Sequence, residues 1–340
     1  MRAALLSKYH EPLELTELPT PEPVRATDVV VKVAGAGVCA TDLHAIEGWM
    51  EDAGMQLPRV LGHENAGWVE AVGSGVSTVK AGDPVVVYPA RSCGLCLACR
   101  RGDDMMCATG QFTGLSVDGG FAEYLLTTER SLVKLAPGVD PADVAPHADA
   151  GITAYHAVRK ICHLARPGSV AVVIGIGGVG HIGLQLLVAL GSSTVVAVDA
   201  DERARTLAGK LGADHVVEAG EAVQAARDLS GGRGADVVID FVGTDSTHAD
   251  SIAALRRGGT YSVVGYGGTV RAPSASLVNN EHAVIANLVG SWPDLYELLE
   301  LHAAGKVVLH TQRHRFEEVN DVLEALRRGE VFGRAVLVPD

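Results

Sequence analysis

The feature that most constrains this chain is a run of glycines placed directly after a stretch of apolar residues. Residues 170–174 are all apolar, and the sequence Gly-Ile-Gly-Gly-Val-Gly follows at 175–180. An apolar run without alternation predicts a strand that is buried on both faces. Beyond the glycines, Ile182, Leu186 and Leu190 recur at helical spacing up to Gly191. The segment therefore predicts a buried parallel strand, a tight turn and a helix.

The glycines have the spacing G-x-G-x-x-G at Gly175, Gly177 and Gly180. In such a turn the first glycine lets the chain reverse, the second admits the backbone close to a pyrophosphate, and the third lets helix and strand touch. The free N–H groups of the new helix then point at the phosphates. We therefore expect a dinucleotide to bind at this turn, whose other residues include Gly178 and Val179.

A second apolar strand is predicted over residues 194–198, and Asp199 follows it. A carboxylate at this place can accept hydrogen bonds from both hydroxyls of an adenosine ribose and would repel a 2′-phosphate. Asp199 therefore favours NAD over NADP. The alternative interpretation is an acidic residue that only closes a strand.

Composition excludes several classes of partner. The chain has 340 residues, with 28 basic and 41 acidic side chains and a net charge of -13, which argues against binding to nucleic acid or to an anionic membrane. No apolar run approaches membrane-spanning length, and the first residues lack the apolar core of a signal peptide. We expect a soluble, cytoplasmic protein with a small-molecule partner, no nucleic acid and no membrane.

Four of the six cysteines are crowded into one segment with the spacing C-x2-C-x2-C-x7-C, at Cys93, Cys96, Cys99 and Cys107. Four thiolates at this spacing can close a tetrahedron around zinc without leaving an open position, so they predict a structural metal site. Paired disulfides or free thiols are the alternatives.

Two further clusters carry donor side chains. Cys39-Ala-Thr-Asp-Leu-His44 offers a thiolate followed by a hydroxyl, and residues 62–76 offer an imidazole beside a carboxylate. The second cluster matches the pattern G-H-E-x2-G-x5-G-x2-V, and with it the chain resembles, over essentially its whole length, the zinc-containing alcohol dehydrogenases of the medium-chain dehydrogenase/reductase superfamily.

The resemblance implies an α/β protein with a GroES-like β-rich catalytic domain and a Rossmann domain, which is a doubly wound parallel sheet that binds the cofactor. Strands that alternate with helical runs after residue 170 agree with this fold. We expect the catalytic domain at 1–150 and 288–340, with the structural zinc lobe at 91–109, and the NAD-binding domain at 151–287.

The same resemblance implies a catalytic zinc on Cys39, His63 and a third residue. The family commonly has a cysteine there and in some members an acid; in this chain Asp149 takes the place, with His147 and Cys162 as alternatives. Glu64 could approach the zinc during ligand exchange without being a permanent ligand. Asp42 is expected to orient a ligand histidine.

The family's proton relay implies that the Thr41 hydroxyl takes the substrate proton and passes it through the nicotinamide ribose to His44 and solvent. His44 could instead be an ordinary surface histidine.

By the same resemblance, the turns after two later strands, with Val242, Val264 and Gly265, should pack near the nicotinamide, and Arg334 should hold the pyrophosphate. For Arg334 the alternative is a surface charge. Trp49, Trp292 and Tyr266 could line an apolar substrate pocket or belong to the core.

The sequence thus predicts an enzyme that binds two zinc ions per chain and transfers a hydride reversibly between a primary or secondary alcohol and NAD, giving an aldehyde or ketone. The alternatives are a zinc-free, NADPH-dependent reductase of the same superfamily and a catalytically inactive cofactor-binding protein. A homo-oligomer is expected, with a tetramer favoured over a dimer.

Overall fold

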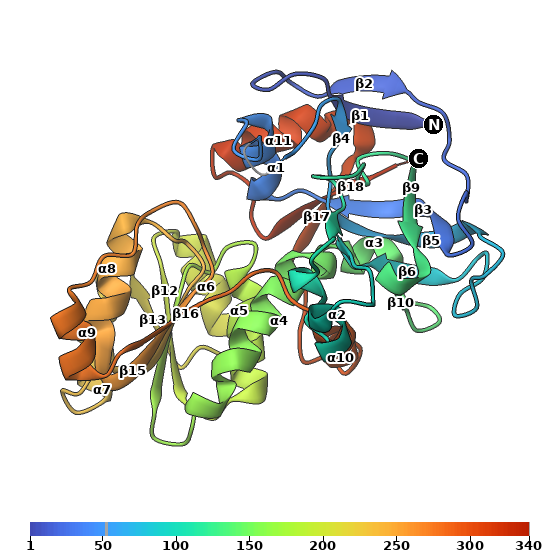
Figure 1. The fold of residues 1–340 in the computed structure, drawn as a ribbon. Coiled ribbons are helices and arrows are strands. Elements are labelled where there is room, and N and C mark those ends of the chain that lie inside the picture. The colour runs from blue at the N-terminus through green and yellow to red at the C-terminus, as the bar shows by residue number, and fades with distance from the viewer. Residues whose placement is uncertain (52–53, 340) are drawn as a thin grey trace. The chain divides into compact units, whose positions relative to one another are not determined.

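The computed structural model describes residues 1–51 and 54–339 and divides into two compact units (Figure 1). Unit 1 contains Met1–Ile152, Ser291–Leu299 and Leu309–Asp340, and unit 2 contains Thr153–Gly290 and Glu300–Val308. No helix of the described residues is long and apolar enough to cross a membrane.

Unit 2 is built on a six-stranded parallel sheet with the order β13-β12-β11-β14-β15-β16. Its strands are β11 (Val170–Ile174), β12 (Thr194–Asp199), β13 (His215–Glu218), β14 (Ala235–Asp240), β15 (Leu255–Val263) and β16 (Ala283–Ala286). Helices flank this sheet on both sides in Figure 1: α4 (Ala150–Ile161), α5 (Gly180–Leu190), α6 (Glu202–Lys210), α7 (Ala222–Leu229), α8 (Asp245–Ala254) and α9 (Ser274–Asn280). Every residue of β11 is buried, so the strand and the doubly wound sheet predicted from the apolar run are confirmed.

Helix α5 begins at Gly180 and ends where expected, before Gly191. Gly191 has an extended backbone (φ −109°), so the left-handed conformation of a usual C-cap glycine does not explain the glycine at this position. A Cβ at Gly191 would lie 2.8 Å from the carbonyl oxygen of Leu187, and this close approach accounts for the glycine.

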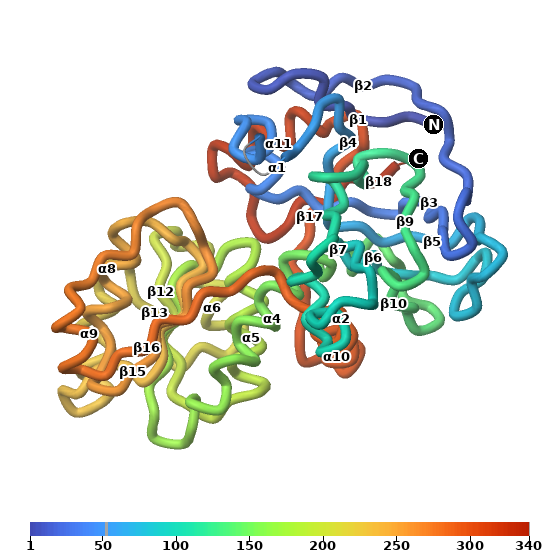
Figure 2. The backbone as a smooth tube through the Cα atoms, in the orientation of Figure 1, coloured from blue at the N-terminus to red at the C-terminus, as the bar shows by residue number. Residues whose placement is uncertain are grey.

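Unit 1 is a β-rich body with a seven-stranded sheet of order β10-β6-β5-β3-β18-β17, in which β9 also pairs with β3. These strands are β3 (Asp28–Gly37), β5 (Glu64–Val72), β6 (Pro84–Val87), β9 (Tyr124–Thr128), β10 (Leu132–Lys134), β17 (Thr311–Arg315) and β18 (Arg334–Val338). The C-terminal β18 pairs antiparallel with β3, so two segments far apart in the sequence are neighbours in this sheet (Figure 2).

The remaining elements of unit 1 are short. A three-stranded sheet contains β1 (Arg2–Leu6), β2 (Glu14–Glu17) and β4 (Arg59–Val60), and β7 (Ala90–Arg91) pairs with β8 (Gln111–Phe112). The helices are α1 (Ala40–Ile46), α2 (Leu97–Arg101), α3 (Pro141–Val144), α11 (Val319–Arg327) and the first turns of α10 (Trp292–Ala303). The core between these elements is lined by apolar side chains of both chain ends, among them Leu6, Val31 and Leu337.

Candidate functional site

Three donor side chains from separate parts of unit 1 meet at one buried point. The Cys39 Sγ, a His63 ring nitrogen and an Asp149 carboxylate oxygen lie within 4.8 Å of one another. The Cys39 Sγ is 3.7 Å and the His63 Nε2 is 3.5 Å from the Asp149 Oδ2. At the usual Zn–S, Zn–N and Zn–O bond lengths, the donor atoms around a tetrahedral zinc ion lie about 3.3–3.6 Å apart. The spacing therefore fits a zinc ion that keeps a fourth position open.

The local fold explains why these residues converge. Cys39 is the N-cap of α1, directly after the central strand β3. His63 directly precedes β5, which pairs with β3, and Asp149 directly precedes α4. His147 is buried and Cys162 lies in unit 2, where its thiol donates to the Arg159 carbonyl. Within the described chain, neither alternative ligand belongs to the cluster.

His63 is only 1% exposed; its ring nitrogens lie 3.3 Å from the Asp42 Oδ1 and 3.5 Å from the Asp149 Oδ2, and neither makes a well-formed hydrogen bond to a described residue. An imidazole buried in this state costs free energy unless a further partner completes it. Burial acts to lower the pKa of His63, but Asp42, Asp149 and Cys39 raise it well above its usual value. The surroundings thus favour a positive charge at the ring, as expected for a cation-binding site.

Asp42 connects two of the three donors. Its Oδ2 accepts from the backbone N–H of Cys39 at 2.9 Å, and its Oδ1 lies 3.3 Å from the Nδ1 of His63. A carboxylate behind a ligand histidine fixes the orientation of its ring.

Glu64 and Arg334 form a buried ion pair beside this cluster, which the sequence analysis did not anticipate. The Glu64 Oε1 also accepts from the backbone N–H of Ala150 at 3.1 Å. Burial raises the pKa of Glu64 although Arg334 acts to lower it. No local pattern links two residues from opposite ends of the chain, so this contact had no signal in the sequence.

The side chains expected around the reaction centre lie in different surroundings. Thr41 is in the first turn of α1, and His44 later in this helix stacks on Trp49 with ring centroids 4.1 Å apart. Trp49 is 54% and Tyr266 is 55% exposed. Trp292 donates to the Leu132 carbonyl at 3.0 Å. It also lines a cavity of about 630 Å³ that Cys99 borders, so its place is beside the cysteine cluster.

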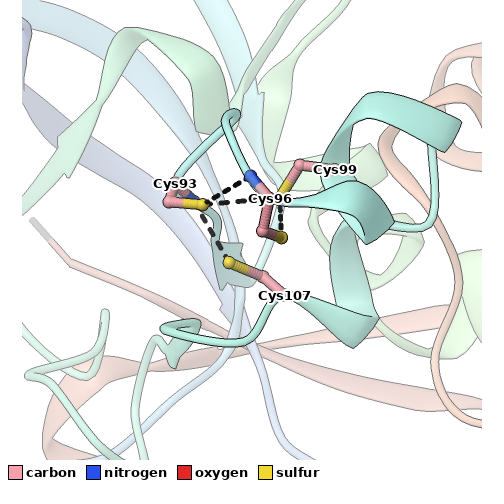
Figure 3. A group of neighbouring side chains, drawn as sticks. All are labelled: Cys93, Cys96, Cys99 and Cys107. Atoms are coloured by element: carbon pink, nitrogen blue, oxygen red, sulfur yellow. Dashed lines mark hydrogen bonds between the residues drawn. The ribbon is translucent and has the colours of Figure 1, made fainter.

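The four crowded cysteines form the second cluster (Figure 3). Their side chains point toward one another from the loop before α2, from α2 itself and from the turn that follows it, and all four Sγ atoms lie within 4.8 Å. The Cys96 and Cys99 sulfurs are 3.5 Å apart, and those of Cys93 and Cys99 are 4.0 Å apart. The sulfur atoms of four thiolates around a zinc ion lie about 3.8 Å apart at the usual Zn–S bond length. None of these four cysteines forms a disulfide, so the disulfide alternative does not hold.

Backbone groups prepare one of these thiols for a metal. The N–H groups of Leu95 and Cys96 each donate to the Cys93 Sγ at 3.4 Å and lower the pKa of Cys93 to about 6. A thiolate is the form that binds zinc. Burial instead raises the pKa of Cys99 to about 12, as expected where no cation compensates the charge.

The glycine turn of unit 2 has the geometry of a dinucleotide turn. Gly175 has a positive φ of 85°, and a Cβ at Gly180 would lie 1.7 Å from the Gly175 carbonyl oxygen. A Cβ at Gly177 would meet no described atom within 4 Å, so this backbone faces open space. The Asp199 carboxylate at the end of β12 accepts from the N–H groups of Ile176 at 2.7 Å and Asp201 at 2.8 Å. Asp199 therefore also holds the glycine turn.

The fold and these sites define a class: a two-unit protein with a Rossmann unit that carries a dinucleotide-type glycine turn and a β-rich unit that carries two side-chain clusters able to hold a metal ion. Two family models match the chain, the alcohol dehydrogenase GroES-like domain at residues 25–137 and the zinc-binding dehydrogenase at residues 178–304.

Among similar proteins, an alcohol dehydrogenase of Geobacillus stearothermophilus is 36% identical, over 99% of this chain and 98% of its own. The D-arabinose 1-dehydrogenase (NADP(+)) of Saccharolobus solfataricus is also 36% identical, over 99% of this chain and 97% of its own. The crystal structure of the alcohol dehydrogenase of Aeropyrum pernix matches with a TM-score of 0.96 and 44% identity, over the whole of both chains.

The chain therefore belongs to the zinc-type alcohol dehydrogenases of the medium-chain dehydrogenase/reductase superfamily. It is an oxidoreductase that uses zinc and NAD to interconvert alcohols with aldehydes or ketones.

Proposed function

We propose that Cys39, His63 and Asp149 hold the catalytic zinc of this alcohol dehydrogenase. The observation that carries the proposal is the convergence of the three donors at the buried His63, whose ring lies between the Asp42 and Asp149 carboxylates. When bound, zinc lowers the pKa of an alcohol and NAD accepts its hydride. Asp42 orients the His63 ring, and Glu64 pairs with Arg334 and is not a permanent ligand.

Thr41 and His44 provide the proton path in this proposal. The Thr41 hydroxyl takes the proton of the substrate alcohol, and His44 releases it to solvent. Burial lowers the pKa of His44, so its ring is neutral and able to accept a proton near neutral pH.

We assign the cofactor to unit 2. The adenosine ribose would bind at Asp199 and the pyrophosphate at Gly175, Gly177, Gly178, Val179 and Gly180, while Val242, Val264 and Gly265 would face the nicotinamide. The open space at Gly177 and the acidic side chain after β12 support this assignment. Arg334 remains a candidate for the pyrophosphate, with the additional role of pairing with Glu64.

The second zinc would bind Cys93, Cys96, Cys99 and Cys107, giving two ions per chain, and the lobe at 91–109 would depend on it. The catalytic domain would comprise residues 1–150 and 288–340, and the NAD-binding domain residues 151–287. We further propose that the protein works in the cytoplasm, because crowded free thiols suit a reducing compartment.

We also propose a homo-oligomer, with a tetramer favoured over a dimer. Strand β16 is an edge strand of its sheet, and Ala283, Val284 and Ala286 on it are exposed. Nearby in sequence, Val278 and Leu288 are exposed as well. An exposed apolar edge strand is a template for pairing with another chain, so this edge supports self-association.

The assignment of the third zinc ligand is tested by Asp149→Ala. The variant loses a donor of the open site, so turnover of a panel of alcohols, followed at the NADH absorbance, should fall at least about a thousandfold. NADH binding, measured by calorimetry, should stay unchanged because the proposed cofactor contacts lie elsewhere.

The matched control is Asp149→Cys, which supplies another zinc donor and should keep measurable turnover. Substantial activity in Asp149→Ala would contradict the assignment and move the ligand role to His147.

A further inference from the structure

Asp240, the last residue of β14, connects two turns at the carboxyl edge of the parallel sheet. It is fully buried. Its Oδ1 accepts from the backbone N–H groups of Val242 at 2.8 Å and Gly243 at 3.1 Å. Its carbonyl oxygen accepts from the N–H groups of Val264 and Gly265, each at 3.0 Å. One residue therefore holds the turn after β14 with its side chain and the turn after β15 with its backbone.

The two turns also pack directly against each other. A Cβ at Gly243 would lie 2.2 Å from the carbonyl carbon of Gly265, and a Cβ at Gly265 would lie 2.4 Å from that of Val242. Such distances are far below contact distance, so the backbones touch where the side chains are absent. A shift of one turn must therefore move the other.

The second carboxylate oxygen of Asp240 is held by a buried network. The Tyr261 hydroxyl on β15 donates to the Asp240 Oδ2 at 3.1 Å, and the Nδ1 of His248 on α8 lies 2.5 Å from the same hydroxyl. Tyr261 and His248 are 0% and 2% exposed. Burial and the charge of Asp240 raise the pKa of Tyr261, so the hydroxyl keeps its proton.

The direction of this network follows from counting hydrogens. A carboxylate only accepts, and a tyrosine hydroxyl has one hydrogen to give. When Tyr261 donates to Asp240, the His248 Nδ1 must carry a hydrogen and donate to the Tyr261 oxygen. His248, Tyr261 and Asp240 then form a one-way chain of donors that ends at the turn amides.

We infer that Tyr261 and His248 are positioning residues that set the Val242–Gly243 and Val264–Gly265 turns for the nicotinamide half of the cofactor. The inference rests on the proposed function, which assigns the nicotinamide to these turns. Without the Tyr261 hydroxyl, the Asp240 Oδ2 loses its hydrogen bond, and only Oδ1 and its two turn amides then orient the carboxylate. In the described contacts, Asp240, Tyr261 and His248 make no hydrogen bond to Asp199 or to the glycine turn, although the Val242 side chain packs against Gly175.

The test compares two ligands of the intact protein by calorimetry. NADH contains the nicotinamide, and ADP-ribose lacks it but keeps the adenosine and the pyrophosphate. Tyr261→Phe should raise the Kd for NADH about tenfold, the effect of a hydrogen bond to a charged group, and leave the Kd for ADP-ribose unchanged. An unchanged NADH affinity, or equal weakening of both ligands, would overturn the inference.

His248 provides a second pair of variants in case Tyr261→Phe does not fold. His248→Asn retains an amide that can donate to Tyr261 and should bind NADH nearly as the parent does, whereas His248→Phe should weaken NADH binding severalfold. Equal NADH affinity in these two variants contradicts the donor chain.

Asp236→Asn is the matched stability control. Asp236 lies at the opposite end of β14, accepts from the Val170 N–H at 2.9 Å and pairs with Arg256. The Asp236→Asn variant should have a lower melting temperature and an unchanged ratio of the NADH and ADP-ribose Kd values. A changed ratio would mean that destabilisation alone explains the effect of Tyr261→Phe.

The unaltered protein distinguishes this inference from the proposed function. If it binds ADP-ribose but not NADH, the nicotinamide assignment is refuted; if it binds neither, the proposed NAD site as a whole is refuted.

Discussion

Asp42 contacts two of the proposed zinc donors from a single buried position. It receives the backbone N–H of Cys39 and faces the Nδ1 of His63. The first bond fixes the start of α1, and the second contact places a carboxylate at the His63 nitrogen opposite the one that faces Asp149. The donor set is therefore largely preformed by the chain, which is the arrangement that keeps a metal site rigid.

Asp199 accepts hydrogen bonds from the N–H groups of Ile176 and Asp201, and its charge would also repel a 2′-phosphate. A test of coenzyme selectivity must therefore distinguish the loss of this charge from the loss of the turn contacts. Asp199→Gly combined with Ala200→Arg should raise kcat/KM for NADP relative to NAD by at least about tenfold, since a repulsive charge becomes an attractive one. Steady-state kinetics with both coenzymes measure this ratio. We also expect a lower melting temperature from the lost turn contacts.

Asp214→Asn separates the two effects. The Asp214 carboxylate accepts from the Val195 N–H at 2.8 Å, at the amino end of the same strand β12. This variant should lose stability without a change in coenzyme selectivity. If Asp199→Gly with Ala200→Arg keeps the parent selectivity, Asp199 does not lie at the ribose.

Individual elements were predictable where the signal was local. The strand, glycine turn and helix of residues 170–190 follow from apolar periodicity and glycine spacing, and so does β12. Further along the chain, Glu202–Lys210 form α6, and a 3₁₀ turn (Phe316–Glu318) leads directly into α11. Propensity alone does not distinguish a helix from the turn that precedes it.

The candidate site was predictable only in part. Cys39, His63 and the cysteine cluster stand in recognisable motifs, and the structure brings each set of donors together. Their roles as ligands stay predictions. The Glu64–Arg334 pair and the network of Asp240, Tyr261 and His248 join residues without a motif, because tertiary folding alone creates these contacts.

The cysteine lobe should behave as a separate metal-dependent element. Elemental analysis of the purified protein should find two zinc ions per chain, and Cys107→Ser should reduce this number to one. Hydrogen exchange of residues 93–107 should accelerate in the variant, while the initial turnover per remaining zinc persists.

Cys162→Ser is the control for the loss of a thiol, since Cys162 lies outside both donor sets. It should keep two zinc ions. One zinc ion in the unaltered protein would contradict the assignment of two sites.

At the scale of the whole molecule, the exposed edge of unit 2 predicts self-association. Val284 is 42% exposed on β16. In a two-fold pairing of β16 with its copy, Val284→Asp would bring like charges near each other and weaken the contact. Light scattering coupled to gel filtration should therefore show a smaller assembly for this variant than for the parent.

Val24→Asp serves as the comparison, because Val24 is 87% exposed and belongs to unit 1. It should leave the mass unchanged. A monomeric parent protein would refute the proposed oligomer, and an unchanged mass of Val284→Asp would place the contact elsewhere.

The position of β18 inside the sheet of unit 1 makes the surroundings of Glu64 depend on a strand that is distant in the sequence. Both β3 and β17 need this last strand as a neighbour, and its first residue supplies the guanidinium that neutralises Glu64. A nascent chain still lacking its final residues would leave that carboxylate buried without a counter-charge. A chain truncated before β18 should therefore be degraded by proteases rather than accumulate as a partly active enzyme.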